Sequence, residues 1–151
     1  IAKGLKLIID NNPESYLILP MHANKVVREM LLKILDKHPR ILLREPMNYE
    51  EMVSAIKNCK LILTDSGGIQ EEAPSFGKPV LVLRNTTERQ EAIDYGTAKL
   101  VGHEPHDIFK EAHLLLNDHE RYKKMSSIKN PYGDGSASRK ILKACMNFLE
   151  K

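Results

Sequence analysis

The segment most suited to chemistry is Asp-Ser-Gly-Gly-Ile-Gln-Glu-Glu at 65–72, which directly follows a short apolar run at 61–64. A strand that ends in a Ser-Gly-Gly turn and continues as a helix leaves the first helical N–H groups unpaired, at the positive end of the helix dipole. Gly67 and Gly68 let a ligand approach the backbone closely, and the Ser66 hydroxyl can add a donor. The segment therefore predicts a phosphate-binding site. A simple N-cap at Ser66 and an ordinary tight turn are the alternative explanation.

Two charged side chains extend this prediction from a phosphate to a nucleotide. Glu72 lies one helical turn beyond Gly68, where a carboxylate suits the two hydroxyls of a ribose; a solvated first-turn glutamate is the alternative. Arg89 follows the next apolar run, at 80–83, and in a parallel sheet its loop should lie beside the Ser-Gly-Gly turn. Its guanidinium could then bind a diphosphate through charge-assisted hydrogen bonds, unless it is an ordinary surface arginine. Thr87 and Gln90 also fit a capping box, which would explain both without a ligand.

Short apolar runs alternate with longer helical stretches along the chain, as in α/β proteins with a parallel sheet. Because the runs are almost entirely apolar, we expect one open, doubly wound, Rossmann-like sheet with helices on both faces. The expected strands are 16–19, 40–43, 61–64, 80–83 and 99–101.

Helical periodicity predicts five further elements, at 24–36, 49–58, 105–117, 119–127 and 136–151. The helix at 24–36 should pack through one face, and the last helix should bury its apolar side. Those two predicted faces consist of Val27, Met30, Leu31, Ile34 and Leu35, and of Ile141, Leu142, Cys145, Phe148 and Leu149. A turn cluster at 130–135 precedes the last helix, with Ser136 as its expected N-cap.

The composition is that of an ordinary globular protein of one domain, with 151 residues, 42% hydrophobic and 28% charged. A net charge of +3 without a basic block gives little support for nucleic-acid binding. No apolar run approaches the roughly 18–20 residues that cross a bilayer, so we expect no membrane association. Cys59 and Cys145 are far apart and no signal peptide is present, which favours a reduced, cytoplasmic setting with both cysteines facing the core. The chain starts at Ile1 without a methionine and enters a helical pattern at once, so we expect a piece of a longer protein.

Several motifs together resemble the non-hydrolysing UDP-N-acetylglucosamine 2-epimerases in order and spacing. They are the run at 63–74, Gly-Lys-Pro-Val-Leu-Val at 77–82, Thr-Thr-Glu-Arg at 86–89, Gly-Thr at 96–97 and Asn-Pro-Tyr-Gly-Asp-Gly at 130–135. The resemblance covers essentially the whole chain. It implies that residues 1–151 form a single UDP-binding domain, the C-terminal half of a glycosyltransferase B-type fold, with the N-terminal catalytic domain outside this chain.

The resemblance also implies roles for individual residues in UDP binding. The residues that it matches to UDP contacts are Ser66, Gly67 and Gly68 at the phosphates, Glu72 at the ribose, Arg89 at the diphosphate, and the Met47 backbone and Met52 side chain at the uracil. Many relatives place an aromatic residue where Met52 stands, and a thioether covers a ring face without stacking on it. Met47 and Met52 could equally be core residues.

The matched segment Pro-Met-His-Ala-Asn at 20–24 contains His22, which in bacterial members of the family contributes to a second, regulatory site for UDP-N-acetylglucosamine. A solvated loop residue or a neighbour of an N-cap is the alternative for His22. The remaining candidates show no metal-ligand spacing and are expected at the surface: His103, His106, His113 and His119.

The resemblance further implies an isomerase that interconverts UDP-GlcNAc and UDP-ManNAc without a cofactor. UDP is eliminated to leave a 2-acetamidoglucal and is then added back after reprotonation on the other face, in a full-length protein expected to be a homodimer. The family's proton-transferring carboxylates and catalytic histidine have no counterpart in residues 1–151, so we expect this chain alone to bind UDP weakly and not to epimerise. A glycosyltransferase, a hydrolysing epimerase and a non-enzymatic sugar-nucleotide module remain as alternatives.

Overall fold

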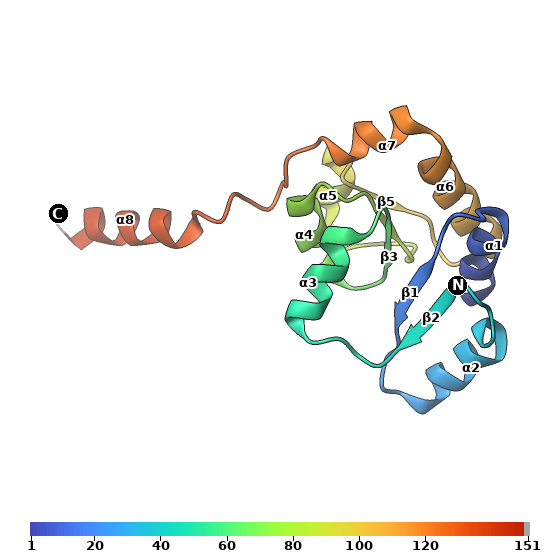
Figure 1. The fold of residues 1–151 in the computed structure, drawn as a ribbon. Coiled ribbons are helices and arrows are strands. Elements are labelled where there is room, and N and C mark those ends of the chain that lie inside the picture. The colour runs from blue at the N-terminus through green and yellow to red at the C-terminus, as the bar shows by residue number, and fades with distance from the viewer. Residues whose placement is uncertain (150–151) are drawn as a thin grey trace.

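The structure is a computed structural model that describes residues 1–149 (Figure 1). The strands agree with the predicted ones to within about one residue at each end. The elements in chain order are α1 (Ala2–Asn11), β1 (Leu17–Pro20), α2 (Lys25–Leu35), β2 (Ile41–Arg44), α3 (Tyr49–Asn58), β3 (Ile62–Thr64), α4 (Gly67–Glu72), the 3-10 helix η1 (Ala73–Phe76), β4 (Val80–Val82), α5 (Gln90–Tyr95), β5 (Ala98–Leu100), α6 (Pro105–Asn117), α7 (His119–Ser126) and α8 (Ala137–Leu149).

All described strand pairs are parallel, which confirms the α/β class, but the strands form two sheets. β1 pairs with β2, and β3, β4 and β5 form the second sheet in that order. The prediction of one continuous sheet was therefore wrong. Apolar runs indicate which segments are strands, whereas the pairing of strand edges depends on how the segments are placed in space.

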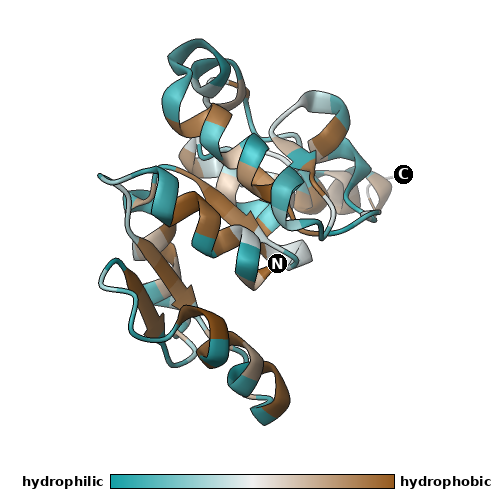
Figure 2. Cartoon of the chain, turned by 90° about the vertical axis from the view of Figure 1, so that its right-hand side faces the viewer, coloured by the Kyte–Doolittle hydropathy of each residue, from teal (hydrophilic) through white to brown (hydrophobic). Residues whose placement is uncertain are grey.

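Alternate residues of the central strands point to opposite faces of the sheet, into two apolar layers. Figure 2 shows that the strands are mainly hydrophobic. Leu81 belongs to the core beneath α1, α2 and α6, whereas Val80 and Val82 pack toward α3, α4 and α5. Helices thus cover both faces of the three-stranded sheet, as the apolar runs predicted. The layer formed by α1, α2 and α6 also packs on one face of β1 and β2.

The other face of the two-stranded sheet is open to solvent. Ile18 and Leu42, which lie opposite each other in the register, are both exposed. On α2 the predicted packing face is only half correct, since Leu31, Ile34 and Leu35 join the core while Val27 and Met30 are exposed. Hydrophobic periodicity locates an apolar face but does not say how much of it finds a partner.

The final helix differs most from expectation. Figure 1 shows α8 standing well away from the rest of the domain. Ile141, Leu142, Phe148 and Leu149 are exposed, with Phe148 at 78%, and Cys145 is exposed too. The inward orientation predicted for these five residues was wrong, because no apolar surface within residues 1–149 lies against this helix.

The two cysteines should differ in reactivity. Cys59 is half-buried at the end of α3, and burial raises the pKa of its thiol, whereas Cys145 is exposed on α8. Because the thiolate is the reactive form, we expect Ellman's reagent to modify Cys145 rapidly and Cys59 several-fold more slowly at pH 8. Cys59→Ser and Cys145→Ser variants assign the two phases, and equal rates for both thiols would contradict the placement of α8.

No helix within residues 1–149 is both long enough and apolar enough to cross a membrane.

Candidate functional site

The Ser-Gly-Gly turn lies at the carboxyl end of β3, where it was predicted. The Ser66 N–H donates to Thr64 Oγ1 at 3.0 Å, and the Ser66 carbonyl accepts from the Gln70 N–H at 3.3 Å as α4 begins. Ser66 holds the N-cap position, but its side chain makes no capping hydrogen bond and the residue is exposed. The hydroxyl therefore has no capping role, contrary to the alternative explanation from sequence.

Arg89 reaches this turn from the loop between β4 and α5. A Cβ atom built on Gly67 would lie 3.3 Å from Arg89 Nη2 and 3.3 Å from Glu88 Oε1. The structure thus brings the guanidinium directly against the Ser-Gly-Gly turn, as the parallel arrangement of β3 and β4 predicted. The side chain is about two-thirds covered, with a relative exposure of 32%.

Two carboxylates hold the Arg89 guanidinium in this position. Arg89 Nε donates to Glu71 Oε1 in an ion pair, and Nη1 lies 3.5 Å from Glu88 Oε1. The bond to Glu71 raises the pKa of Arg89, so the guanidinium stays charged. Nη2, the nitrogen closest to Gly67, has no partner in either ion pair. Sequence reasoning missed both carboxylates. Glu71 lies in α4, where no spacing rule connects it to Arg89, and the side-chain direction of Glu88, the sequence neighbour of Arg89, is not defined by spacing.

The Glu72 carboxylate lies next to the second glycine of this turn. A Cβ atom on Gly68 would lie 4.0 Å from Glu72 Oε1 and 3.9 Å from Ser66 Oγ. The carboxylate and the hydroxyl therefore flank the same backbone, as expected from one helical turn of separation. A ligand at this turn would meet the donors of Arg89 and Ser66 and the acceptor carboxylate of Glu72.

A buried glutamine ties the two loops together. Gln70 is fully buried; its Nε2 donates to the Ser66 carbonyl at 3.2 Å, and its Oε1 accepts from the Thr87 hydroxyl at 2.8 Å. Thr87 Oγ1 also accepts from the Arg89 N–H at 3.1 Å. The predicted capping box of Thr87 and Gln90 was wrong, since α5 begins at Gln90 and the Gln90 side chain bonds to Asp94. Thr87 instead couples the Arg89 loop to the Ser-Gly-Gly turn.

The turn cluster at 130–135 forms hydrogen bonds to the backbone of both the Ser-Gly-Gly segment and the Arg89 loop. Asn130 Nδ2 donates to the Glu71 carbonyl at 3.0 Å, and the Tyr132 hydroxyl lies 3.4 Å from the Arg89 carbonyl. The Asn-Pro-Tyr motif therefore supports the backbone at both members of the Arg89–Glu71 pair.

The remaining predicted residues lie less close to the turn. Met52 is partly buried and packs against the same core cluster as Ile69 of α4. Met47 is partly buried ahead of α3. His22 is exposed after β1, its Nδ1 accepting from the Asn24 N–H at 3.2 Å, which fits a loop residue beside an N-cap.

Of the other predicted surface histidines, His103, His106 and His119 are exposed. His113 is half-buried, and its Nδ1 lies 3.1 Å from Asn12 Oδ1. Within residues 1–149, no group of three His, Cys, Asp or Glu side chains is arranged to hold a metal ion.

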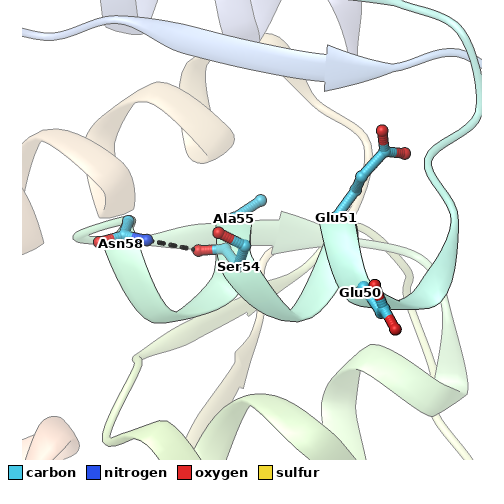
Figure 3. Close-up of a pocket in the computed structure, with 5 residues that line it drawn as sticks. All are labelled: Glu50, Glu51, Ser54, Ala55 and Asn58. Atoms are coloured by element: carbon cyan, nitrogen blue, oxygen red, sulfur yellow. Dashed lines mark hydrogen bonds between the residues drawn. The ribbon is translucent and has the colours of Figure 1, made fainter.

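A shallow depression lies along α3, away from the Ser-Gly-Gly turn (Figure 3). It is lined by Glu50, Glu51, Ser54, Ala55 and Asn58, and Asn58 Nδ2 donates to the Ser54 carbonyl at 2.8 Å. All of its lining residues come from one helix, so no groups from different elements converge there. The convergent side chains at the carboxyl ends of β3 and β4 make the better candidate site.

The fold and this site together define a Rossmann-like α/β domain with a glycosyltransferase B-type arrangement and a polar, arginine-bearing turn at its carboxyl edge. The sequence model described as UDP-N-acetylglucosamine 2-epimerase matches residues 1–146. The chain belongs to the UDP-N-acetylglucosamine 2-epimerase family.

Individual relatives agree with this assignment. A UDP-N-acetylglucosamine 2-epimerase of Campylobacter jejuni is 46% identical over 142 residues, which are 94% of this chain and 37% of that protein. The crystal structure of a Listeria monocytogenes protein described as a putative UDP-N-acetylglucosamine 2-epimerase superposes with a TM-score of 0.94 at 44% identity, over 99% of this chain and 40% of that one. The S. aureus MnaA–UDP co-structure gives 0.93 at 45% identity, over 99% and 41%. The chain therefore spans about 40% of the length of these relatives.

Proposed function

We propose that residues 1–151 form the UDP-binding domain of a non-hydrolysing UDP-N-acetylglucosamine 2-epimerase, which interconverts UDP-GlcNAc and UDP-ManNAc. The observation that carries this proposal is the position of the Arg89 guanidinium next to Gly67, with the Glu72 carboxylate next to Gly68. A cation and helix N–H groups suit a diphosphate, and an adjacent carboxylate suits ribose hydroxyls. Family membership and the UDP named for the S. aureus relative support the same ligand.

In this proposal the domain acts on the leaving group. Elimination of UDP from the sugar leaves a 2-acetamidoglucal and develops charge on the diphosphate, which Arg89 and the helix N–H groups at the start of α4 stabilise. The same contacts retain UDP until it adds back to C1, after C2 of the sugar has been reprotonated on its other face. The groups that transfer protons lie outside residues 1–151, so this chain binds UDP but does not epimerise by itself. His22 is proposed to belong to a second, regulatory sugar-nucleotide site.

Ser66→Ala is the first test of the proposed UDP contacts. The Ser66 hydroxyl is exposed and makes no capping bond, so its removal should leave the fold intact while removing one hydrogen bond to the diphosphate. We expect UDP affinity to fall about 3- to 30-fold, corresponding to a bond of about 0.7–2 kcal/mol. Titration calorimetry with UDP measures this, and Ser127→Ala on the α7 side is the matched control. Equal UDP affinity in Ser66→Ala and the unsubstituted chain would remove Ser66 from the site.

The reaction is tested on a longer polypeptide that contains this chain. Incubation with UDP-GlcNAc and no acceptor should yield UDP-ManNAc by NMR. Release of free ManNAc and UDP would instead identify a hydrolysing epimerase, and absence of any epimer would favour a glycosyltransferase or a binding module.

A further inference from the structure

The Glu88 carboxylate lies at the same point of the Ser-Gly-Gly turn as the Arg89 guanidinium. A Cβ atom on Gly67 would lie 3.3 Å from Glu88 Oε1, the same distance as from Arg89 Nη2. Because Gly67 has no Cβ, both side chains can approach the backbone closely. The space that the glycine leaves open beside Arg89 is therefore taken by a carboxylate oxygen.

This position suits a phosphate oxygen, and two anions cannot share it. In the proposed function the diphosphate pairs with Arg89 beside Gly67, where it would meet Glu88 Oε1. The Glu88 carboxyl is ionised at neutral pH, because a hydrogen bond from its own backbone N–H and the charges of Arg84 and Arg89 lower its pKa. Like charges at contact distance repel each other. Binding of a diphosphate therefore requires the carboxylate to move.

Glu88 is the more loosely held of the two acidic partners of Arg89. Arg89 Nε is hydrogen-bonded to Glu71, whereas Glu88 Oε1 lies 3.5 Å from Nη1. The Glu88 side chain is also 55% exposed, compared with 41% for Glu71. The bond to Glu71 can therefore keep the guanidinium in place when Glu88 moves.

Arg84 gives the Glu88 carboxylate a second partner. Arg84 Nη1 donates to Glu88 Oε2 at 3.2 Å, so the two oxygens of Glu88 face two different arginines. Both members of this pair are exposed side chains, and such side chains change rotamer within picoseconds to nanoseconds. Rotation of the carboxylate toward Arg84 takes Oε1 away from Gly67 and preserves an ion pair.

We propose that the Glu88 carboxylate is an intramolecular competitor for the anion position beside Gly67, and that a diphosphate displaces it onto Arg84. Before the exchange, Arg89 pairs with both Glu71 and Glu88. After it, the diphosphate replaces Glu88 at Arg89, and Glu88 pairs with Arg84 alone. Every charged group keeps a partner, and the affinity of the site for anions is set by how well a ligand competes with Glu88. The inference rests on the anion-binding part of the proposed function.

Titration calorimetry with inorganic diphosphate at low ionic strength tests the exchange on this chain. We expect Glu88→Gln to bind diphosphate at least about threefold more tightly, because a neutral amide competes less for Arg89. Glu91→Gln, which removes the same charge from an exposed residue in the first turn of α5, is the matched control and should change the affinity less than about twofold. Unchanged or weaker binding by Glu88→Gln would overturn the proposal, because Glu88 would then only position Arg89. Absence of diphosphate binding in every variant would overturn it as well.

A double-mutant cycle tests the role of Arg84. Arg84→Ala should weaken diphosphate binding at least about threefold, because Glu88 loses the partner that draws it away from Gly67. In the Glu88→Gln background the same substitution should have little effect. An equal loss in both backgrounds would overturn the exchange, because it would show that Arg84 attracts the ligand directly.

The same variants titrated with UDP separate this inference from the proposed function. Diphosphate binding that Glu88→Gln strengthens, without binding of UDP by any variant, would support the exchange and remove the assignment of the site to UDP. UDP binding that falls in Arg89→Ala but is unchanged in Glu88→Gln would support the UDP site and overturn the exchange.

Discussion

Arg89→Ala should lower the affinity for UDP about 10- to 100-fold. The Nη2 atom of the guanidinium lies next to Gly67, and charge-assisted hydrogen bonds to a phosphate contribute about 1.5–3 kcal/mol each. Arg89→Lys should lose part of this affinity, because an ammonium keeps the charge without the fork of two parallel donors. Titration calorimetry with UDP measures both variants.

The Glu71 carboxylate, which forms an ion pair with Arg89, allows a stricter test of the role of Arg89 in UDP binding. Without the arginine, the Glu71 side chain leaves an uncompensated negative charge next to the bound diphosphate. Adding Glu71→Gln to Arg89→Ala should therefore restore part of the affinity, whereas Glu71→Gln alone should weaken binding because it loosens the ion pair that positions Arg89. Arg121→Ala, which removes an exposed arginine paired with Asp118 on α7, is the control and should leave UDP binding unchanged. Wild-type affinity in a folded Arg89→Ala variant would exclude Arg89 from the site.

Gln70→Met should destabilise the domain by about 1–3 kcal/mol and weaken UDP binding as well. Gln70 is fully buried, and its amide bonds to both the Ser66 carbonyl and the Thr87 hydroxyl. Methionine of similar volume leaves the partly buried Thr87 hydroxyl and the Ser66 carbonyl without the Gln70 side-chain amide as their partner. Loss of a hydrogen-bond partner inside a protein costs about 1–3 kcal/mol. Because total stability is about 5–15 kcal/mol for a domain, urea unfolding should detect the change readily.

A double-mutant cycle separates stability from binding. Thr87→Val alone should also destabilise, but Gln70→Met with Thr87→Val replaces both partners by apolar groups and should recover much of the lost stability. UDP affinity should not recover, since the Arg89 N–H also loses its acceptor at Thr87 and the two loops remain uncoupled. Additive losses in the free energy of unfolding would show that the bond between Gln70 and Thr87 contributes nothing to the fold.

The sequence by itself predicted the elements and the first part of the site. Apolar runs located all five strands, because a strand covered on both faces leaves an almost continuous apolar pattern. The Ser-Gly-Gly turn and Arg89 were predicted to meet, because neighbouring parallel strands bring their carboxyl ends to one edge. These are local patterns or simple consequences of sheet topology.

The tertiary structure decided which side chains hold Arg89 and which edges and faces remain unpaired. Glu71 and the bridge from Gln70 to Thr87 link two loops that are separated by a strand, so no local spacing predicts them. The direction of the neighbouring Glu88 side chain is likewise set only in the folded chain. The split into two sheets and the exposure of α8 were likewise hidden from the sequence. Periodicity reports that a strand edge or a helix face can be paired or buried, whereas pairing and burial require a second surface whose position only the folded chain defines.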